Sequence, residues 1–255
     1  MQSVKYILAC AIFLVAAKML IAQDKQSLIR SYQDSAKHYE ALNKNLQAYN
    51  FSKKVYSLVS SMPNPSAEQL GRTASDLGTY AYRMGNIGLS ETHHREALKL
   101  FRSMPSPNYE CLYLSGNNMG NIMWLSSKVD SALYFFNVAL GALDKMDSTP
   151  LNKYYRPAVL NNNLAAIYGI QGKTTEGILA MKETISDLRR YLAIKDSSLK
   201  RDNAMHFQFE AADNLAGIYK ELGDYRTAYG LLTHSYEEKQ KNLNAGNPDI
   251  HKGIR

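Results

Sequence analysis

Apolar residues recur three or four positions apart along most of this chain, and this spacing is typical of one face of an α-helix. In the stretch from Asn214 to Ala228, Leu215 and Tyr219 lie on one such face. Gly223 then stands where the C-terminus of a helix favours a left-handed residue, and Asp224 can cap the helix that follows. The stretch therefore predicts two antiparallel helices joined by a tight turn.

The same helical hairpin recurs upstream in one register. The small residue of the first helix, the turn residue and the small residue opening the second helix each have four counterparts. The three series are Ala36, Gly78, Gly120, Ala165 and Ala216; Asn43, Gly85, Ser127, Gly172 and Gly223; and Ala48, Ser90, Ala132, Gly177 and Ala228. All three step by 42, 42, 45 and 51 residues. A register shared by three positions predicts an internal repeat, in which each hairpin buries its apolar surface against its neighbours.

Five repeats follow from this register and from the connectors between hairpins. Two connectors, Ser-Met-Pro-Asn-Pro at 61–65 and Ser-Met-Pro-Ser-Pro at 103–107, are nearly identical, and their prolines end any helix. The predicted repeats cover residues 27–65, 66–107, 108–150, 151–198 and 199–245, with a stub of a further repeat at 246–255. Because solenoids normally end in a polar capping element, the stub favours the interpretation that this chain is a fragment of a longer protein.

The repeat pattern resembles the tetratricopeptide repeat (TPR) over residues 27–243. The matching residues are Leu215-Ala216-x2-Tyr219, Leu164-Ala165-x2-Tyr168 and Ala132-x3-Phe136. The period exceeds the usual length of about 34 residues, and the Trp expected before the Leu is absent. With Asn247-Pro248-Asp249, the long period resembles the kinesin-light-chain type of TPR. The resemblance implies an all-α, right-handed superhelical solenoid of about five antiparallel helix pairs, whose concave groove is lined by the first helix of each repeat.

The first residues differ in kind from the rest of the chain. Lys5 precedes a 12-residue uncharged run from Tyr6 to Ala17, and polar sequence begins at Gln23. A run of this length fits a signal peptide and is shorter than the roughly 20 residues that span a bilayer. We therefore expect residues 1–22 to be a signal peptide, and the protein to be periplasmic or secreted. The alternative is an uncleaved N-terminal segment that tethers the protein to a membrane.

Composition supports a folded protein and excludes some partners. Apolar residues make up 45% of the chain and charged residues 21%, as in ordinary globular domains. The net charge of +7 is spread along the chain without the basic stripe that nucleic-acid binding requires, so we predict no nucleic-acid partner. Beyond residues 1–22 the only cysteine is Cys111, which excludes an internal disulfide there and favours a buried, apolar thiol.

The sequence contains no motif of catalysis or cofactor binding. His-Glu-x-x-His, Cys-x-x-Cys, a phosphate-binding loop and Gly-x-Ser-x-Gly are all missing. His93 and His94 are adjacent and point about 100° apart on a helix, so both cannot easily bind one metal, and His94 falls at a packing position of the repeat. We therefore predict a non-enzymatic scaffold for a protein or peptide partner, with no catalytic residue, metal site or cofactor.

The TPR resemblance also implies which side chains face the groove. In the second repeat they are Arg72, Ser75, Thr79, Tyr82 and Arg83; in the third Leu114, Asn117, Asn121 and Trp124; in the fourth and fifth Val159, Asn162, Asp213 and Lys220. Asn within a helix costs a few tenths of a kcal/mol relative to Ala, so its repeated use indicates a role. The asparagines either hydrogen-bond a bound peptide or stabilise helix stacking. Trp124, the only Trp, is either a core residue or an aromatic anchor for the ligand.

A second hypothesis concerns the sequence beyond this chain. The repeats would be the extracytoplasmic sensor part of a larger signalling protein, with a kinase or DNA-binding output following Arg255.

Overall fold

The computed structural model describes residues 23–199 and 201–242, and every regular element within them is helical. The predicted signal peptide at 1–22 and the stub at 246–255 lie outside the described residues. None of the helices described is both long and apolar enough to span a bilayer.

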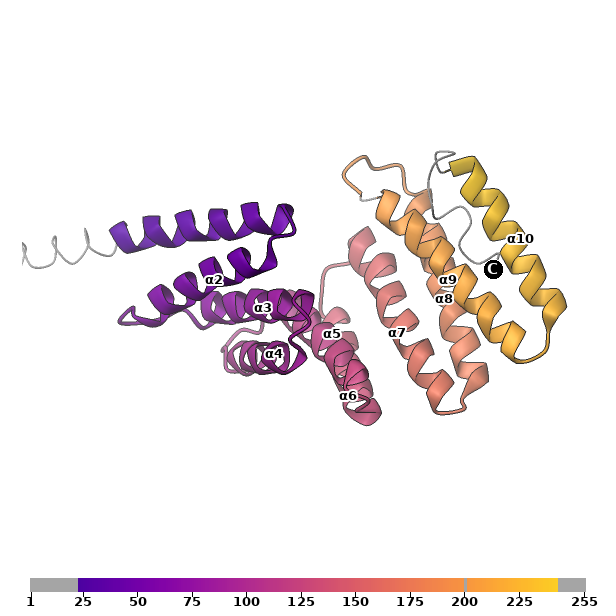
Figure 1. The fold of residues 1–255 in the computed structure, drawn as a ribbon, viewed down its shortest axis with the longest axis horizontal. Coiled ribbons are helices and arrows are strands. Elements are labelled where there is room, and N and C mark those ends of the chain that lie inside the picture. The colour runs from indigo at the N-terminus through magenta and orange to yellow at the C-terminus, as the bar shows by residue number, and fades with distance from the viewer. Residues whose placement is uncertain (1–22, 200, 243–255) are drawn as a thin grey trace, which may run out of the picture. The chain divides into compact units, whose positions relative to one another are not determined.

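Each predicted repeat contains two successive helices (Figure 1). A helix over residues 23–41 precedes α2 (Asn45–Ser60), α3 (Ala67–Arg83) precedes α4 (Ile87–Arg102), and α5 (Tyr109–Leu125) precedes α6 (Val129–Leu143). A π-helical turn, η1 (Leu151–Tyr155), leads into α7 (Arg156–Ile170) and α8 (Thr174–Ala193). The last two of the described helices are α9 (Arg201–Glu221) and α10 (Tyr225–Asn242).

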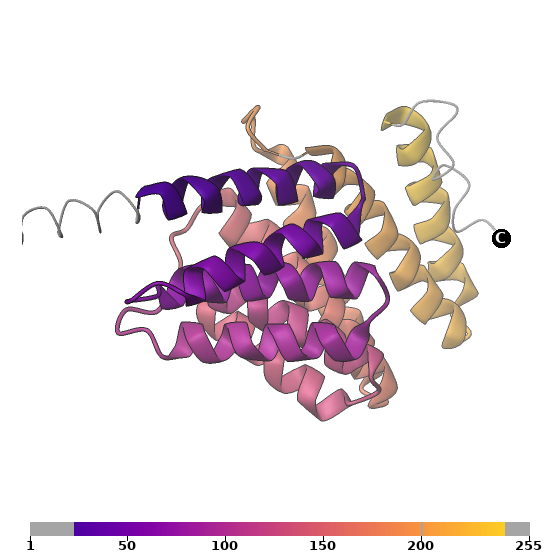
Figure 2. The same cartoon turned by 60° about the vertical axis from the view of Figure 1, so that its left-hand side comes forward.

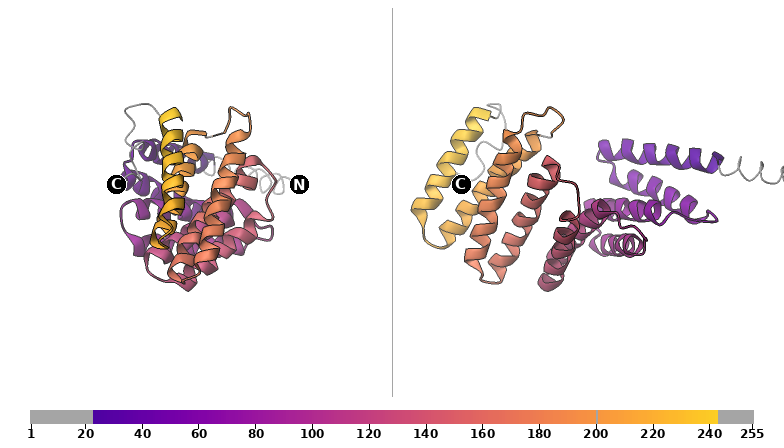
Figure 3. Two further views of the ribbon diagram at one scale, coloured as in Figure 1. Left: turned by 90° about the vertical axis from the view of Figure 1, so that its right-hand side faces the viewer. Right: turned by 180° about the vertical axis from the view of Figure 1, so that it is seen from behind.

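The chain divides into two compact units, one ending at Ile122 and the other beginning at Met123. In the first unit, α3 packs against both α2 and α4 (Figure 2). Ile29 of the helix over residues 23–41 joins Val55 and Val59 of α2 in one core cluster. In the second unit, α8 packs against α7 and α9, and α9 against α10 (Figure 3). Helices that are neighbours in the sequence are thus packed together within each unit.

All five predicted turn residues adopt a left-handed backbone conformation. The angle φ is 54° at Asn43, 77° at Gly85, 57° at Ser127, 70° at Gly172 and 78° at Gly223, and no other described residue has a positive φ. Glycine adopts this conformation without steric cost and asparagine tolerates it, whereas serine does so against its preference. The five turn positions predicted from the repeat register are therefore the positions of the turns in the structure.

Small residues at the predicted positions allow close contact between α3 and α4. A Cβ atom at Gly78 would lie 2.6 Å from the ring of His94, and the Ser90 hydroxyl donates a hydrogen bond of 2.7 Å to the Gly78 carbonyl. His94 is 1% exposed, and burial lowers its pKa to about 4, so the ring is neutral at pH 7. The prediction that His94 is a packing residue is confirmed, as is the burial of Cys111.

Two tyrosines of α2 connect the first repeat to the second helix of the next. The Tyr49 hydroxyl lies 3.0 Å from Nε2 of His93, and the Tyr56 hydroxyl donates to Glu96. Tyr229 of α10 occupies the same register position as Tyr49, because the repeat steps place it 180 residues downstream. It is 72% exposed. The same residue type therefore bridges two repeats in the first unit and stands at the surface in the second.

This difference predicts unequal effects of one substitution at equivalent positions. We expect Tyr49→Phe to lower the free energy of unfolding by about 1 kcal/mol, because it removes the hydrogen bond to His93. Tyr229→Phe, the matched control, is expected to change it by less than about 0.5 kcal/mol. Urea denaturation followed by circular dichroism measures both, and equal effects would show that the bond to His93 adds no net stability.

Candidate binding cavity

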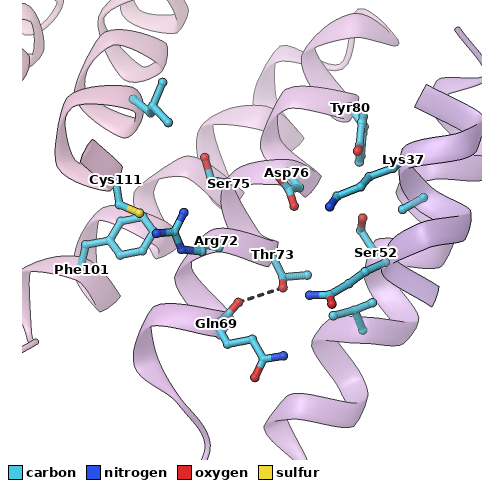
Figure 4. A pocket seen from close by; sticks show the side chains of 14 residues that line it. Lys37, Ser52, Gln69, Arg72, Thr73, Ser75, Asp76, Tyr80, Phe101 and Cys111 are labelled. Atoms are coloured by element: carbon cyan, nitrogen blue, oxygen red, sulfur yellow. Dashed lines mark hydrogen bonds between the residues drawn. The ribbon is translucent and has the colours of Figure 1, made fainter. Parts of the chain in front are cut away.

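A cavity of about 340 Å³ opens among helices of the first unit (Figure 4). The helix over residues 23–41, α2, α3 and the first turns of α5 form its walls, together with one residue of α4. Its polar lining is Gln33, Lys37, Ser52, Gln69, Arg72, Thr73, Ser75, Asp76 and Tyr80; its apolar lining is Ala36, Val55, Phe101, Cys111 and Leu114. The volume is within the range of about 300–1,000 Å³ typical of ligand pockets.

Helix α3 supplies much of the polar lining because one of its faces is polar from end to end. The helix begins after Ser66, whose hydroxyl caps it by accepting a hydrogen bond of 3.2 Å from the backbone N–H of Gln69. Gln69, Thr73, Asp76 and Tyr80 then follow at intervals of three or four residues, which places them along one side of the helix. The cap fixes where α3 begins, and the spacing of its polar residues places this row of side chains along the cavity.

Two arginines at or near the cavity already have acidic partners. Arg72 donates to Glu68 from Nε at 3.0 Å and from Nη2 at 2.8 Å, and Asn108 donates to the same carboxylate at 2.9 Å. Arg83 lies 2.8 Å from Glu40 of the helix over residues 23–41. The charge of each guanidinium is therefore balanced within the protein.

Asp76 differs from these groups, because in the part of the chain that the structure describes its carboxyl makes no hydrogen bond and no ion pair. In Figure 4 it faces Lys37 across the cavity. Enclosure by the cavity walls and the charge of Glu40 raise the pKa of Asp76 to about 6, against the opposing effect of Arg72 and Lys37. The side chain nevertheless stays accessible to water. It is thus an acidic group open to a ligand.

Tyr80 closes one end of the polar row. Its hydroxyl donates a hydrogen bond of 3.1 Å to Glu40, and burial, followed by the charges of Asp76 and Glu40, raises its pKa. The phenol therefore stays protonated at neutral pH. Cys111 is also unreactive, because burial raises the pKa of its thiol to about 11. These protonation states suit binding better than covalent chemistry.

Three of the predicted groove residues line this cavity, namely Arg72, Ser75 and Leu114. Tyr82 and Arg83 do not, although Tyr82 is 43% exposed on the same helix. The predicted groove positions therefore coincide with the cavity only in part.

Sequence reasoning missed the positions that directly follow the predicted ones. Thr73 follows Arg72, Asp76 follows Ser75, and Tyr80 follows Thr79. Each residue turns about 100° around a helix axis, so a shift of one position selects a different side of α3. The polar series at intervals of three and four residues was the signal in the sequence. The sequence did not show which neighbouring helices this polar side of α3 would face.

The other predicted residues of α5 and the second unit have varied surroundings. Asn117, Asn121 and Trp124 are half-buried along α5, and Lys220 is exposed on α9. The Oδ1 atom of Asn162 is buried and has no hydrogen-bond partner among the described residues.

The amide of the adjacent Asn161 contacts the second helix of its own repeat. It donates to Glu183 on α8 at 3.3 Å. The contact of Asn161 is of the kind that the helix-stacking interpretation expects. The ligand-binding interpretation of the asparagines stays a prediction.

Asp213 is held by the second helix of its own repeat. The Ser235 hydroxyl donates to Oδ1 at 2.9 Å, and Nζ of Lys239 lies 2.6 Å from Oδ2. Lys239 is 2% exposed. In this structure the carboxylate therefore joins α9 to α10.

The described residues offer no obvious metal site, since no three His, Cys, Asp or Glu side chains gather within them. No protein-family model matches the sequence, and no curated protein matches it.

Solved structures, in contrast, are similar over most of the chain. BtubC (BKLC) from P. vanneervenii has a TM-score of 0.73 at 16% identity, covering 91% of this chain and 89% of that one. A putative kinesin light chain with nearly identical TPR-like repeats from Podosopora anserina has a TM-score of 0.61 at 12% identity, covering 85% and 97%. MamA from Desulfovibrio magneticus RS-1 has a TM-score of 0.58 at 13% identity, covering 85% and 98%. These similarities confirm the predicted all-α solenoid fold of TPR type.

Proposed function

We propose that this chain, which has the TPR-like fold, is a non-enzymatic scaffold that binds a peptide segment of a partner protein in the cavity of its first unit. The observation that carries the proposal is which helices supply the side chains that line the cavity. The helix over residues 23–41, α3 and α5 are the first helices of three successive repeats, and all three contribute side chains to one cavity. In a TPR-like fold these helices are the ones expected to line the binding surface.

The lining suits an extended peptide. The amides of Gln33 and Gln69 and the hydroxyl of Ser75 can hydrogen-bond the backbone of a peptide. Leu114 is 42% exposed and offers an apolar contact beside them. A few polar groups beside an apolar surface are the usual means by which a cavity orients its ligand.

A cavity-filling substitution tests this proposal. Peptides would first be selected from a displayed random library on the purified chain lacking residues 1–22, and their affinities measured by fluorescence anisotropy. We expect Ser75→Trp to weaken binding at least tenfold, because the indole would occupy the cavity that Ser75 lines. Tyr82→Ala, an exposed position on the same helix outside the cavity, is the matched control and should leave the affinity unchanged.

Circular dichroism of both variants would verify that the fold is intact. If the selected peptides bound Ser75→Trp as tightly as the natural chain, the binding site would lie elsewhere and the proposal would fail.

A further inference from the structure

The charges around the cavity indicate what kind of side chain it accepts. We propose that the cavity binds a cationic side chain of the peptide, a lysine or an arginine, and that Asp76 forms the ion pair with it. This inference rests on the proposed function, because it assumes that a peptide occupies the cavity of the first unit.

The first argument is the balance of charge. Arg72 is bound to Glu68 and Arg83 to Glu40, so these four groups form two internal pairs. Asp76 has no corresponding partner among the residues described, although it lies between these pairs. A partly enclosed carboxylate without a partner gains from a cation that reaches it, since charge-assisted hydrogen bonds are among the strongest in proteins.

The second argument is the shape and polarity of the cavity. Ala36, Val55 and Leu114 provide apolar surface, and Ser75 provides an additional hydroxyl acceptor. Lysine and arginine bury their methylene stems against apolar surface while their charged ends seek polar partners. A cavity of about 340 Å³ with an apolar wall and one open carboxylate matches this division within a single side chain.

The rival occupant is an acidic side chain held by Lys37 and Arg72. Arg72 already donates two hydrogen bonds to Glu68, so an acidic ligand would have to rely mainly on Lys37. It would also meet the negative charges of Asp76 and Glu40. Lys37 is exposed and forms no ion pair within the described part of the chain, so it can turn toward solvent when a ligand cation arrives. The charge arrangement therefore favours the cation.

The pH dependence follows from the groups that face Asp76. These are Lys37 and Glu40 from the helix over residues 23–41, Arg72 and Tyr80 from α3, and Cys111 from α5. The carboxylate of Glu110 acts on Arg72 and Cys111. Because the pKa of Asp76 is raised to about 6, its carboxyl is mostly protonated at pH 5 and mostly ionised at pH 7. Binding of a cation should therefore strengthen about tenfold between these two pH values and change little above pH 7.

The test uses three short probes and two variants whose effects have opposite signs. Acetyl-Ala-Lys-Ala-amide, its uncharged norleucine analogue and its glutamate analogue would be titrated into the isotope-labelled chain, with binding read from amide shifts around Asp76. We expect the lysine peptide to bind at least fivefold tighter than the norleucine peptide. Asp76→Asn should abolish that preference. Lys37→Met should strengthen the binding of the lysine peptide, because it removes the competing cation.

Each alternative result has a distinct meaning. Tightest binding of the glutamate peptide, lost in Lys37→Met, would show an anion site and overturn the inference. Equal binding of the lysine and norleucine peptides would overturn it while leaving peptide binding in the cavity intact. If no peptide shifted signals from the cavity while the fold was intact, the proposed function would fail as well.

Discussion

Replacing Phe101 by alanine is expected to lower the free energy of unfolding of the first unit by about 3–5 kcal/mol. The ring is 1% exposed and packs with Ala74, Ala97 and Cys111 in one core cluster. It also lies against Gly71, where an added Cβ atom would be 2.6 Å from the ring. The ring therefore fills the space that this glycine leaves on α3, and no neighbouring side chain can readily replace it.

Leu100→Ala is the matched control, because this residue is adjacent on α4 and only half-buried. Its expected cost is about 1 kcal/mol, in proportion to the smaller area removed from the core. Urea denaturation measures the size of both losses, and amide hydrogen exchange would locate them in the first unit. A loss below 1 kcal/mol for Phe101→Ala would mean that the core collapses around the missing ring.

Replacing Lys239 by methionine is expected to destabilise the second unit by about 3 kcal/mol, because it leaves a partly buried carboxylate without its cation. The side chains of Lys239 and Asp213 are 3% and 17% exposed, and their charged atoms are 2.6 Å apart. The ring of Phe209 lies 6.0 Å from Nζ of the lysine and adds apolar surroundings. Water can therefore replace the lost partner only in part.

The double variant Asp213→Asn with Lys239→Met measures the interaction energy of the two charges apart from the effect of each single substitution. Because it removes both charges, we expect it to be more stable than Lys239→Met alone by about 2 kcal/mol. Denaturation of the natural chain, both single variants and the double variant completes the cycle. Purely additive effects would show that the two charges do not interact.

The helices and turns of this protein could be predicted from the sequence because their causes are local. The intervals of three and four residues that mark a helical face lie within one or two turns of the chain. The left-handed turns at Gly85, Gly172 and Gly223 need a residue that tolerates positive φ, and this need is visible at a single position. Ser127 keeps the same conformation without that preference, so only the repeat register identified it.

The side of each helix that serves the cavity depended on partners distant in the sequence. Asp76 belongs to the same helix as the predicted Arg72 and Ser75, but its position relative to Lys37 and Glu40 depends on how two helices pack. Asp213 likewise has its partners 22 and 26 residues away on α10. The sequence pattern predicts that a polar side chain lies on a given face of a helix. Which side chain it contacts depends on how that face packs against other helices.

The fold thus follows from periodicity and turn chemistry, which each repeat carries within its own residues. The distribution of charge does not, because whether a carboxylate is paired, like Asp213, or open to a ligand, like Asp76, depends on distances between helices. Tyr49 and Tyr229 make the same point, since equivalent residues in one register are a bridge in one repeat and an exposed surface in another. Sequence alone was sufficient for the repeats and their turns, and only the packed structure shows which polar side chains have partners.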